Sequence, residues 1–355
     1  MSVDKKTGGF KSTGEFLVAV RKYCDRVHPD SRLDRLVSKT MTEGTDGGGG
    51  FTVPEQWAGE ILHAALEQAL VRPRATPFKM TRDTLNVGVL VDSDRSSNIF
   101  GGITFTWIEE TEDKAQYATD PVIGQLKLTA HEGIATCFVQ NQLEDDYEDG
   151  NEKAFEDFMR LAFGRAIAFY EDDSYIHGSG SVMGQPLGVM NSGYTVQVTR
   201  TAGNLVDVAD IGNMAKRLLP GSLKNAVWLI NQSVLAQWVE MQSSAANSSS
   251  VIDLATMRCL GAPIIVSEHC AALGTTGDII LADFSGYVIG DRSLEISGSR
   301  HATYSSNSYG FLQNQTCWRM VLRVDGQPIL TSPITPKRGA SGETLSNFVV
   351  LTTSS

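Results

Sequence analysis

The sequence predicts an α+β protein, because one long helical pattern stands among stretches with the two-residue alternation of β-strands. Between Glu152 and His177, apolar residues recur every three or four positions, as in an amphipathic helix. At about 1.5 Å per residue, this helix is roughly 35–40 Å long. Gly178 and Gly180 end it. Its predicted apolar face carries Phe155, Phe158, Met159, Ala162, Ala166, Phe169 and Tyr170.

Strand patterns precede this helix. Thr84–Val91 and Ile103–Ile108 predict the two arms of a long hairpin, and Val122–Val139 predicts a third strand that returns toward the core. The hairpin has little apolar content of its own, so we expect neighbours to stabilise it. Further upstream, the sequence predicts a helix within 12–37 that Pro29 breaks, an extended Phe51–Thr52, and a helix over 55–70.

Residues 193–314 predict a separate α/β module. Asp207 caps a helix that runs to Leu219, and Asn231 caps a second helix. The module also has predicted strands at 226–230, 263–266, 278–282 and 287–289, and predicted exposed loops at 243–250 and 301–310. A strand at 317–324, a turn at Asp325-Gly326 and a last strand at 347–351 complete the chain.

Composition limits the class of protein. With 355 residues, 41% of them hydrophobic and 20% charged, the chain can bury a sizeable core, which argues against disorder. It has no apolar run of about 18 residues and no secretory signal at its start. Five scattered cysteines without a CxxC pair predict reduced thiols in a cytoplasm. Six histidines lie far apart in the sequence, so we expect no metal or cofactor site.

Charge is unevenly distributed around a net value of −11. Residues 1–39 contain nine basic and five acidic residues, whereas residues 83–120 contain eight acidic and two basic residues. This asymmetry predicts contact between a basic arm and an acidic loop on neighbouring copies; two independently solvated segments are the alternative. The candidate contact residues are Lys5, Lys6, Lys11, Arg21, Lys22 and Arg26 in the arm, and Glu109, Glu110, Glu112, Asp113 and Lys114 in the loop.

A second basic group follows the predicted helix over 55–70. Arg72, Arg74, Lys79 and Arg82 have no acidic residue among them. They are candidates for contact with an acidic neighbour or with DNA, and ordinary surface charge is the alternative.

Motifs for catalysis are weak or missing. Gly47–Gly50 lacks the preceding strand and following lysine of a phosphate-binding loop, so a flexible hinge is expected. Ser267-Glu268-His269-Cys270 places a thiol beside a histidine, but adjacent side chains usually diverge. The acid pairs Glu109/Glu110 and Asp145/Asp146 fit solvated loops better than a glycosidase site. The sequence therefore predicts a structural, self-assembling protein and not an enzyme.

Several stretches, in this order, resemble the tailed-bacteriophage major capsid protein family with the Hong Kong 97 type capsid fold. They are GGGGFTVPEQWAGEIL, the helix 152–177 with GSGSVMGQPLGVMN, AVWLINQSVLAQW, GAPIIVSE with GDIILADFSGYVIGDR, and RVDGQPIL with NFVVL. The resemblance covers residues 10–351. Each motif is unspecific, and their shared order carries the resemblance.

The resemblance implies a set of domains. These are an N-terminal arm at 1–50, an E-loop hairpin at 83–120, an A-domain at 183–315, and a P-domain at 51–82, 121–182 (with the spine helix 152–177) and 316–355. It also implies hexamers and pentamers in an icosahedral shell around packaged double-stranded DNA, without sequence-specific binding. Scaffold, portal and decoration proteins are expected partners, and assembly is expected in the host cytoplasm. Only about 50 residues precede GGGGF, so a separate scaffold or none is expected.

Two other functions compete with this interpretation. One is an encapsulating protein-compartment shell of the same fold, which binds cargo peptides instead of DNA. The other is a hydrolase with a site dispersed through the α/β module, which would need a deep pocket with convergent titratable groups. Lys114 lies where some relatives have a cross-linking lysine, but no partner asparagine or catalytic glutamate matches, so we expect no covalent cross-link.

Overall fold

The computed structural model divides the chain into two compact units. Unit 1 comprises Met1–Pro73, Ala130–Glu171 and Asp291–Val324, and unit 2 comprises Arg74–Thr129, Asp172–Gly290 and Asp325–Ser355. Within these, the structure describes residues 9–10, 13–24, 30–33, 51–52, 69–95, 102–103, 105, 107, 122–142, 152–180, 184–201, 203–244, 251–299, 303–305, 308–309, 313–340 and 342–354. No helix in the described part is long and apolar enough to cross a membrane.

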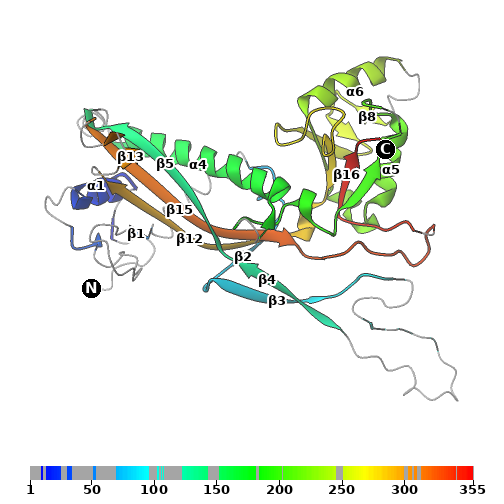
Figure 1. Cartoon of the computed structure of the whole chain (residues 1–355), viewed down its shortest axis with the longest axis horizontal. Coiled ribbons are helices and arrows are strands. Elements are labelled where there is room, and N and C mark those ends of the chain that lie inside the picture. Colours follow the sequence, from blue (N-terminus) through cyan, green and yellow to red (C-terminus); the bar gives the residue numbers. More distant parts are fainter. Residues whose placement is uncertain are drawn as a thin grey trace. The chain divides into compact units, whose positions relative to one another are not determined.

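Unit 1 is built on long strands and one long helix (Figure 1). Two of the strands and the helix continue into unit 2. The elements are α1 (Thr13–Cys24), β1 (Phe51–Thr52), β5 (His131–Gln140), α4 (Glu152–His177), β12 (Tyr287–Ser299), β13 (Thr303–Ser305), β14 (Ser308–Tyr309) and β15 (Gln315–Pro328). The sheet has the order β1-β12-β15-β5, and β2 (Thr76–Lys79) of unit 2 also pairs with β12. The antiparallel ladder of β15 and β5 runs from Gln315↔Gln140 to Val324↔His131.

The predicted helix 152–177 is confirmed, but its predicted apolar face is partly wrong. Met159, Phe163 and Ile167 are buried, whereas Phe169 and Tyr170 are 43% and 69% exposed. Aromatic and aliphatic residues occupy more than half of the helix circumference, so periodicity alone cannot select the side that faces the sheet. Phe158 and Ala162 are also exposed, and the side chain of Phe155 lies outside the described part.

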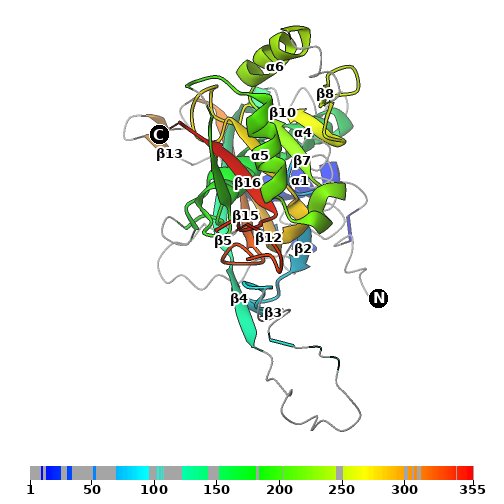
Figure 2. The ribbon, with the colours of Figure 1, turned by 90° about the vertical axis from the view of Figure 1, so that its right-hand side faces the viewer.

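Unit 2 contains a mixed seven-stranded sheet with the order β6-β16-β11-β7-β10-β9-β8. Figure 2 shows the red strand β16 passing beside α5, which contacts both β16 and β6. The elements are η4 (Val189–Asn191), β6 (Val196–Thr199), α5 (Val208–Arg217), η5 (Pro220–Lys224), β7 (Val227–Ile230), α6 (Gln232–Ser244), β8 (Ile252–Asp253), β9 (Arg258–Cys259), β10 (Ala262–Val266), β11 (Ile279–Ala282), η7 (Phe284–Gly286) and β16 (Phe348–Thr352).

Both faces of this sheet are buried at its centre. On one face, Trp228 and Val349 pack in a cluster with Trp238 of α6. On the other face, Phe348 packs against the rings of Tyr194 and Phe284. Strands buried on both faces read as continuous apolar runs, which is why β7 and β11 were predictable from sequence. The helix cap at Asp207 is confirmed by a capping box with Asp210.

The hairpin of unit 2 differs from its prediction. β3 (Thr84–Leu90) is confirmed, but along its whole length it pairs with β4 (Ile123–Thr129), whereas the prediction made 103–108 the other arm of the hairpin. Of 103–108, the described Ile103, Phe105 and Trp107 lie outside any strand. The single strand predicted over 122–139 is two strands, β4 and β5, which separate at Ala130 and belong to different units.

Three further predictions require correction. The turn expected at Asp325-Gly326 is absent, because β15 continues through it to Pro328. The strand predicted at 287–289 is the start of the thirteen-residue β12. Part of the loop predicted at 301–310 forms the short pair β13–β14. Of the helix predicted over 55–70, all but the last two residues lie outside the described part.

Candidate functional site

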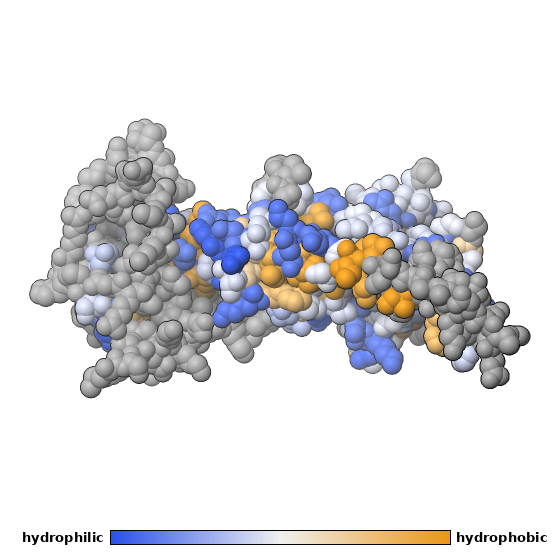
Figure 3. All heavy atoms as spheres, turned by 90° about the horizontal axis from the view of Figure 1, so that it is seen from below, coloured by the Kyte–Doolittle hydropathy of each residue, from blue (hydrophilic) through white to orange (hydrophobic). Residues whose placement is uncertain are grey.

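The hairpin β3–β4 exposes apolar side chains that a folded monomer would normally bury. Leu90 and Ile123 pair across the end of the hairpin, and both are exposed. Figure 3 shows apolar side chains, in orange, gathered in a patch among polar ones. A two-stranded sheet is marginally stable by itself, and exposed apolar patches mark interaction surfaces. The hairpin is therefore a candidate contact surface.

Two further exposed aromatic side chains lie in the loop between β3 and β4. Phe105 is 81% exposed and Trp107 is 89% exposed. Their ring centroids lie 5.2 Å apart in an edge-to-face arrangement. In ITFTWI the two aromatic residues are two positions apart, so an extended chain places both rings on the same side. The same alternation led to the strand prediction for this segment, but it was not interpreted there as a contact surface.

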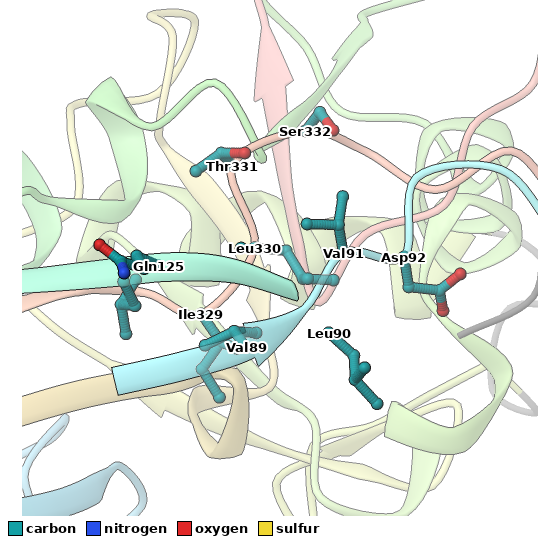
Figure 4. Close-up of a pocket in the computed structure, with 11 residues that line it drawn as sticks. Val89, Leu90, Val91, Asp92, Gln125, Ile329, Leu330, Thr331 and Ser332 are labelled. Atoms are coloured by element: carbon teal, nitrogen blue, oxygen red, sulfur yellow. The ribbon is translucent and has the colours of Figure 1, made fainter. Parts of the chain in front are cut away.

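Two hollows flank the end of β3. The smaller one, about 100 Å³, is lined by residues of β3, β4 and the segment 329–332 (Figure 4). The larger one, about 530 Å³, we call the hairpin groove; it is lined by Gly88, Val89, Leu90, Tyr194, Ser285, Gly286, Ile329, Leu330 and Asn347. Val89, Leu90, Ile329 and Leu330 line both hollows. The main-chain N–H of Ile329 donates to the carbonyl of Gly286 at 2.9 Å, which fixes one wall of the groove.

A polar network lies along the hairpin groove. The Tyr194 hydroxyl donates to the side-chain oxygen of Asn347. The Ser285 hydroxyl donates to Asp283 at 2.7 Å. Burial raises the pKa of the Tyr194 hydroxyl, so this group remains a donor at neutral pH. The groove thus combines apolar walls with fixed polar groups, the composition typical of binding surfaces.

A second apolar surface lies on α4. Phe158, Leu161 and Phe169 are all exposed, at positions separated by three and eight residues. That spacing places them on one side of the helix, with the exposed Arg165 between them. This α4 stripe (Phe158, Leu161, Phe169) faces away from the buried Met159, Phe163 and Ile167.

Most of the predicted charged contact residues lie outside the described part of the chain. Arg74 and Arg82 are exposed, as the prediction of a surface role requires, and so is Lys79. Arg21 and Lys22 lie on α1, whose backbone alone is described at these positions. Outside the described part lie Lys5, Lys6, Lys11, Arg26, Glu109, Glu110, Glu112, Asp113 and Lys114.

Arg72 has a different environment. Its guanidinium is buried and binds Glu171 through two N–H groups, with the Nε bond at 3.0 Å. Its Nη1 lies 2.8 Å from both carboxylate oxygens of Asp291. The positive charge of Arg72 is therefore paired with two carboxylates of its own chain, those of Glu171 and Asp291. No local sequence pattern indicates this cluster, because its members come from three distant segments.

The motif Ser267-Glu268-His269-Cys270 does not form a nucleophilic site. Burial raises the pKa of the Cys270 thiol to about 12, so it remains protonated and unreactive. His269 lies 3.6 Å from Asp173, and its main-chain carbonyl contacts His177. No cluster suited to a metal ion occurs among the described residues.

A family model described as the phage capsid family matches residues 49–338, most of the chain. The chain belongs to the phage capsid family. As a member, this capsid protein has a structural and not an enzymatic function: its copies assemble into pentamers and hexamers of an icosahedral shell, and it is located in the virion. The resemblance seen in the sequence is therefore confirmed.

Solved structures share the fold of this capsid protein. The capsid of an empty GTA particle is 17% identical with a TM-score of 0.56, and the match covers 91% of this chain and 97% of that one. The chain from Mycobacterium phage Adephagia is 15% identical with a TM-score of 0.54, covering 81% and 90%. The chain from Gordonia phage Cozz is 11% identical with a TM-score of 0.52, covering 90% and 92%. No curated protein matches the sequence.

Proposed function

We propose that this protein is the major capsid subunit of a tailed bacteriophage and that its copies pack through the hairpin β3–β4, its loop and the α4 stripe. The observation that carries this proposal is the exposure of Leu90 and Ile123 on a hairpin with little core of its own. Burying such side chains on a neighbour stabilises the assembly by roughly 25 cal/mol per Å² of apolar surface. Many repeats of a weak contact are sufficient for a closed shell.

The proposal assigns each domain of the family to a segment of this chain. Residues 1–50 form the arm, 83–120 the E-loop, 183–315 the A-domain, and the remaining segments the P-domain. The basic residues of the arm contact the acidic run Glu109–Asp113 of a neighbour, while Arg74 and Arg82 provide further contacts. Charge complementarity of this kind selects the register between copies more than it adds affinity.

The shell encloses double-stranded DNA without sequence-specific binding. A net charge of −11 disfavours tight binding of the whole surface to phosphates, which suits a container from which DNA must leave. Scaffold, portal and decoration proteins are the further partners, and the subunits assemble in the host cytoplasm.

Electron microscopy of the purified full-length chain tests the assembly. Hollow icosahedral particles or capsomer rings are expected, and a protein that remains monomeric under all assembly conditions would contradict the proposal. Particles produced during phage growth should contain double-stranded DNA that resists nuclease. Particles that instead contain a bound cargo protein and no DNA would favour the encapsulating compartment.

The role of the hairpin is tested by the double variant Leu90→Ser/Ile123→Ser. We expect a folded subunit with a much smaller assembled fraction, measured by sedimentation. A matched control replaces two exposed leucines elsewhere in unit 2, Leu205→Ser/Leu223→Ser. Equal loss of assembly in both variants would show that the hairpin has no special role.

A further inference from the structure

The loop between β3 and β4 carries two aromatic side chains that nothing in the described part covers. Phe105 and Trp107 are the most exposed large apolar residues there, at 81% and 89%. Aromatic side chains of this kind dominate binding energy when they enter a pocket, because they bury a large area and lose little conformational entropy. Their edge-to-face contact makes them a preformed pair.

The hairpin groove is the larger of the two hollows beside β3. An apolar cavity of about 150 Å³ is large enough to bind benzene. The hairpin groove, at about 530 Å³, is several times larger than such a cavity and is open to solvent, so aromatic side chains can enter it from outside. The smaller hollow beside it, about 100 Å³, is too small for either ring.

The chemistry of the groove also matches the pair. Val89, Leu90 and Leu330 supply apolar walls. The indole N–H of Trp107 needs an acceptor once it is buried. The Ser285 hydroxyl and the Asn347 side-chain oxygen lie along the groove, and each has acceptor capacity left after its own hydrogen bond.

We propose that Phe105 and Trp107 of one copy insert into the hairpin groove of a neighbouring copy. This inference rests on the proposed function, since it requires copies that pack through the hairpin and its loop. The donating surface and the receiving surface are different parts of the same chain. Such a heterologous contact repeats around a ring and closes it when the rotation allows. The aromatic pair thus links successive subunits of a capsomer.

Site-directed cross-linking tests the inference. The double variant Trp107→Cys/Leu330→Cys is assembled and treated with a short bismaleimide. We expect covalent dimers and higher multimers on a denaturing gel, from assembled material only. The wild-type chain with its five native cysteines, each single variant, and Leu205→Cys/Leu330→Cys measure the background. The last control places a cysteine at an exposed leucine of the same unit.

The outcomes separate this inference from the proposed function. If the double variant assembles, at the higher concentration that the loss of Trp107 requires, but gives no cross-link above the controls, the aromatic contact is wrong while the capsid function stands. If the product is an internally cross-linked monomer, the pair contacts the groove of its own chain, which also contradicts the inference. If the wild-type chain forms no particles at all, the proposed function itself fails.

A second experiment does not depend on cross-linking. Phe105→Ala/Trp107→Ala should raise the subunit concentration needed for assembly by about tenfold or more, as expected when two buried anchors are lost. Leu330→Glu, which places a charge in the groove, should have a similar effect. Trp107→Phe, which keeps an aromatic ring, should restore most of the assembly. Unchanged assembly of the double alanine variant would overturn the inference.

Discussion

Arg72 shows at the residue scale how one side chain can connect three distant segments. Its planar guanidinium binds Glu171 of α4 on one edge and Asp291 of β12 on the other. Arginine suits this position, because its fork of donors matches two carboxylates at once and a lysine ammonium does not. Both Arg72 and Glu171 are buried, so neither charge can turn to water if its partner is lost.

Removing this arginine should therefore be costly. We expect Arg72→Ala to lower the free energy of unfolding by about 3–5 kcal/mol, because the buried Glu171 carboxylate remains without its cation and the partly exposed Asp291 loses its partner. Arg72→Lys should recover part of the loss. The control Arg82→Ala removes an exposed arginine and should change stability by less than about 0.5 kcal/mol. Urea unfolding followed by circular dichroism measures both; equal stability of the two alanine variants would contradict the prediction.

The buried thiols give a second prediction for single residues. Burial raises the pKa of Cys259 and Cys270 from 9.0 to about 12. In the unfolded chain these thiols ionise near pH 9, while in the folded chain they stay neutral. Their contribution to stability is therefore complete below about pH 9 and is lost as the pH rises toward 12. Folded protein at pH 8 should leave both cysteines unlabelled by iodoacetamide, as peptide mass spectrometry can show, and unfolding in urea should expose them. Rapid labelling of either residue in the folded chain would disprove this assignment.

At the scale of elements, two glycines explain the sequence that follows α4. The N–H of Gly188 donates to the carbonyl of Gly178 at 2.8 Å, so two backbone segments lie in direct contact. A Cβ atom on Gly188 would lie 2.5 Å from the nitrogen of Gly178 and 2.6 Å from the carbonyl oxygen of Ile176. These are backbone atoms and cannot move aside cheaply.

Gly188→Ala should accordingly destabilise unit 2, by about 1–3 kcal/mol, the usual range for overpacking. The matched control is Gly212→Ala in α5, where a Cβ atom meets nothing within 4 Å. In a helix interior that change removes the entropic cost of glycine and should stabilise the protein by up to about 1 kcal/mol. Thermal unfolding of the two variants should shift in opposite directions; shifts of the same sign would refute the packing argument.

The helix α4 was predictable in its ends but not in its orientation. Acidic residues at its start and Gly178 after His177 are local signals, and local signals determine where a helix begins and ends. The side that packs on the sheet depends on residues far away in the chain. Phe169 and Tyr170 look like core residues in the sequence, yet both are exposed.

A proline in the middle of α4 tests its structural role. Ala166→Pro removes one main-chain hydrogen bond and clashes with the preceding turn, which costs about 3 kcal/mol or more. We expect loss of assembly together with reduced helix content by circular dichroism. The exposed Ala162→Ser is the matched control and should assemble. If Ala166→Pro assembled as the wild type does, the helix would not have the stiffening role proposed for it.

At the scale of the whole molecule, the sequence predicted elements better than their pairing. The four-residue runs of β7 and β11 were predictable because every side chain in them is buried. The position of β16 between β6 and β11 was not, since it joins segments more than 60 residues apart. The predicted partner of β3 was wrong for the same reason. The segment ITFTWI has the alternation of a strand, but β3 forms its hydrogen-bonded ladder with β4. The hairpin groove combines residues from five separate segments of the chain, so no local pattern could reveal it.

The charge asymmetry of the chain is a property of the whole molecule, and it needs a test that leaves the core intact. Deleting the first 40 residues would also remove Phe16, Val20 and Leu33, all of which are fully buried. Reversing charges avoids this problem. Lys5→Glu/Lys6→Glu/Lys11→Glu should leave thermal stability nearly unchanged and should weaken assembly, because the reversed residues repel the acidic run Glu109–Asp113 of a neighbour.

Salt provides the decisive comparison for this variant. Salt screens interactions between exposed charges that are farther apart than a Debye length, which is about 8 Å at physiological ionic strength and about 3 Å at 1 M salt. The defect of the triple variant should therefore shrink as salt is added, when the assembled fraction is measured by sedimentation relative to the wild type. Lys224→Glu/Lys337→Glu/Arg338→Glu changes the net charge equally at other exposed positions and should assemble normally. If the two triple variants assemble equally poorly, net charge alone is responsible, and the arm has no specific acidic partner.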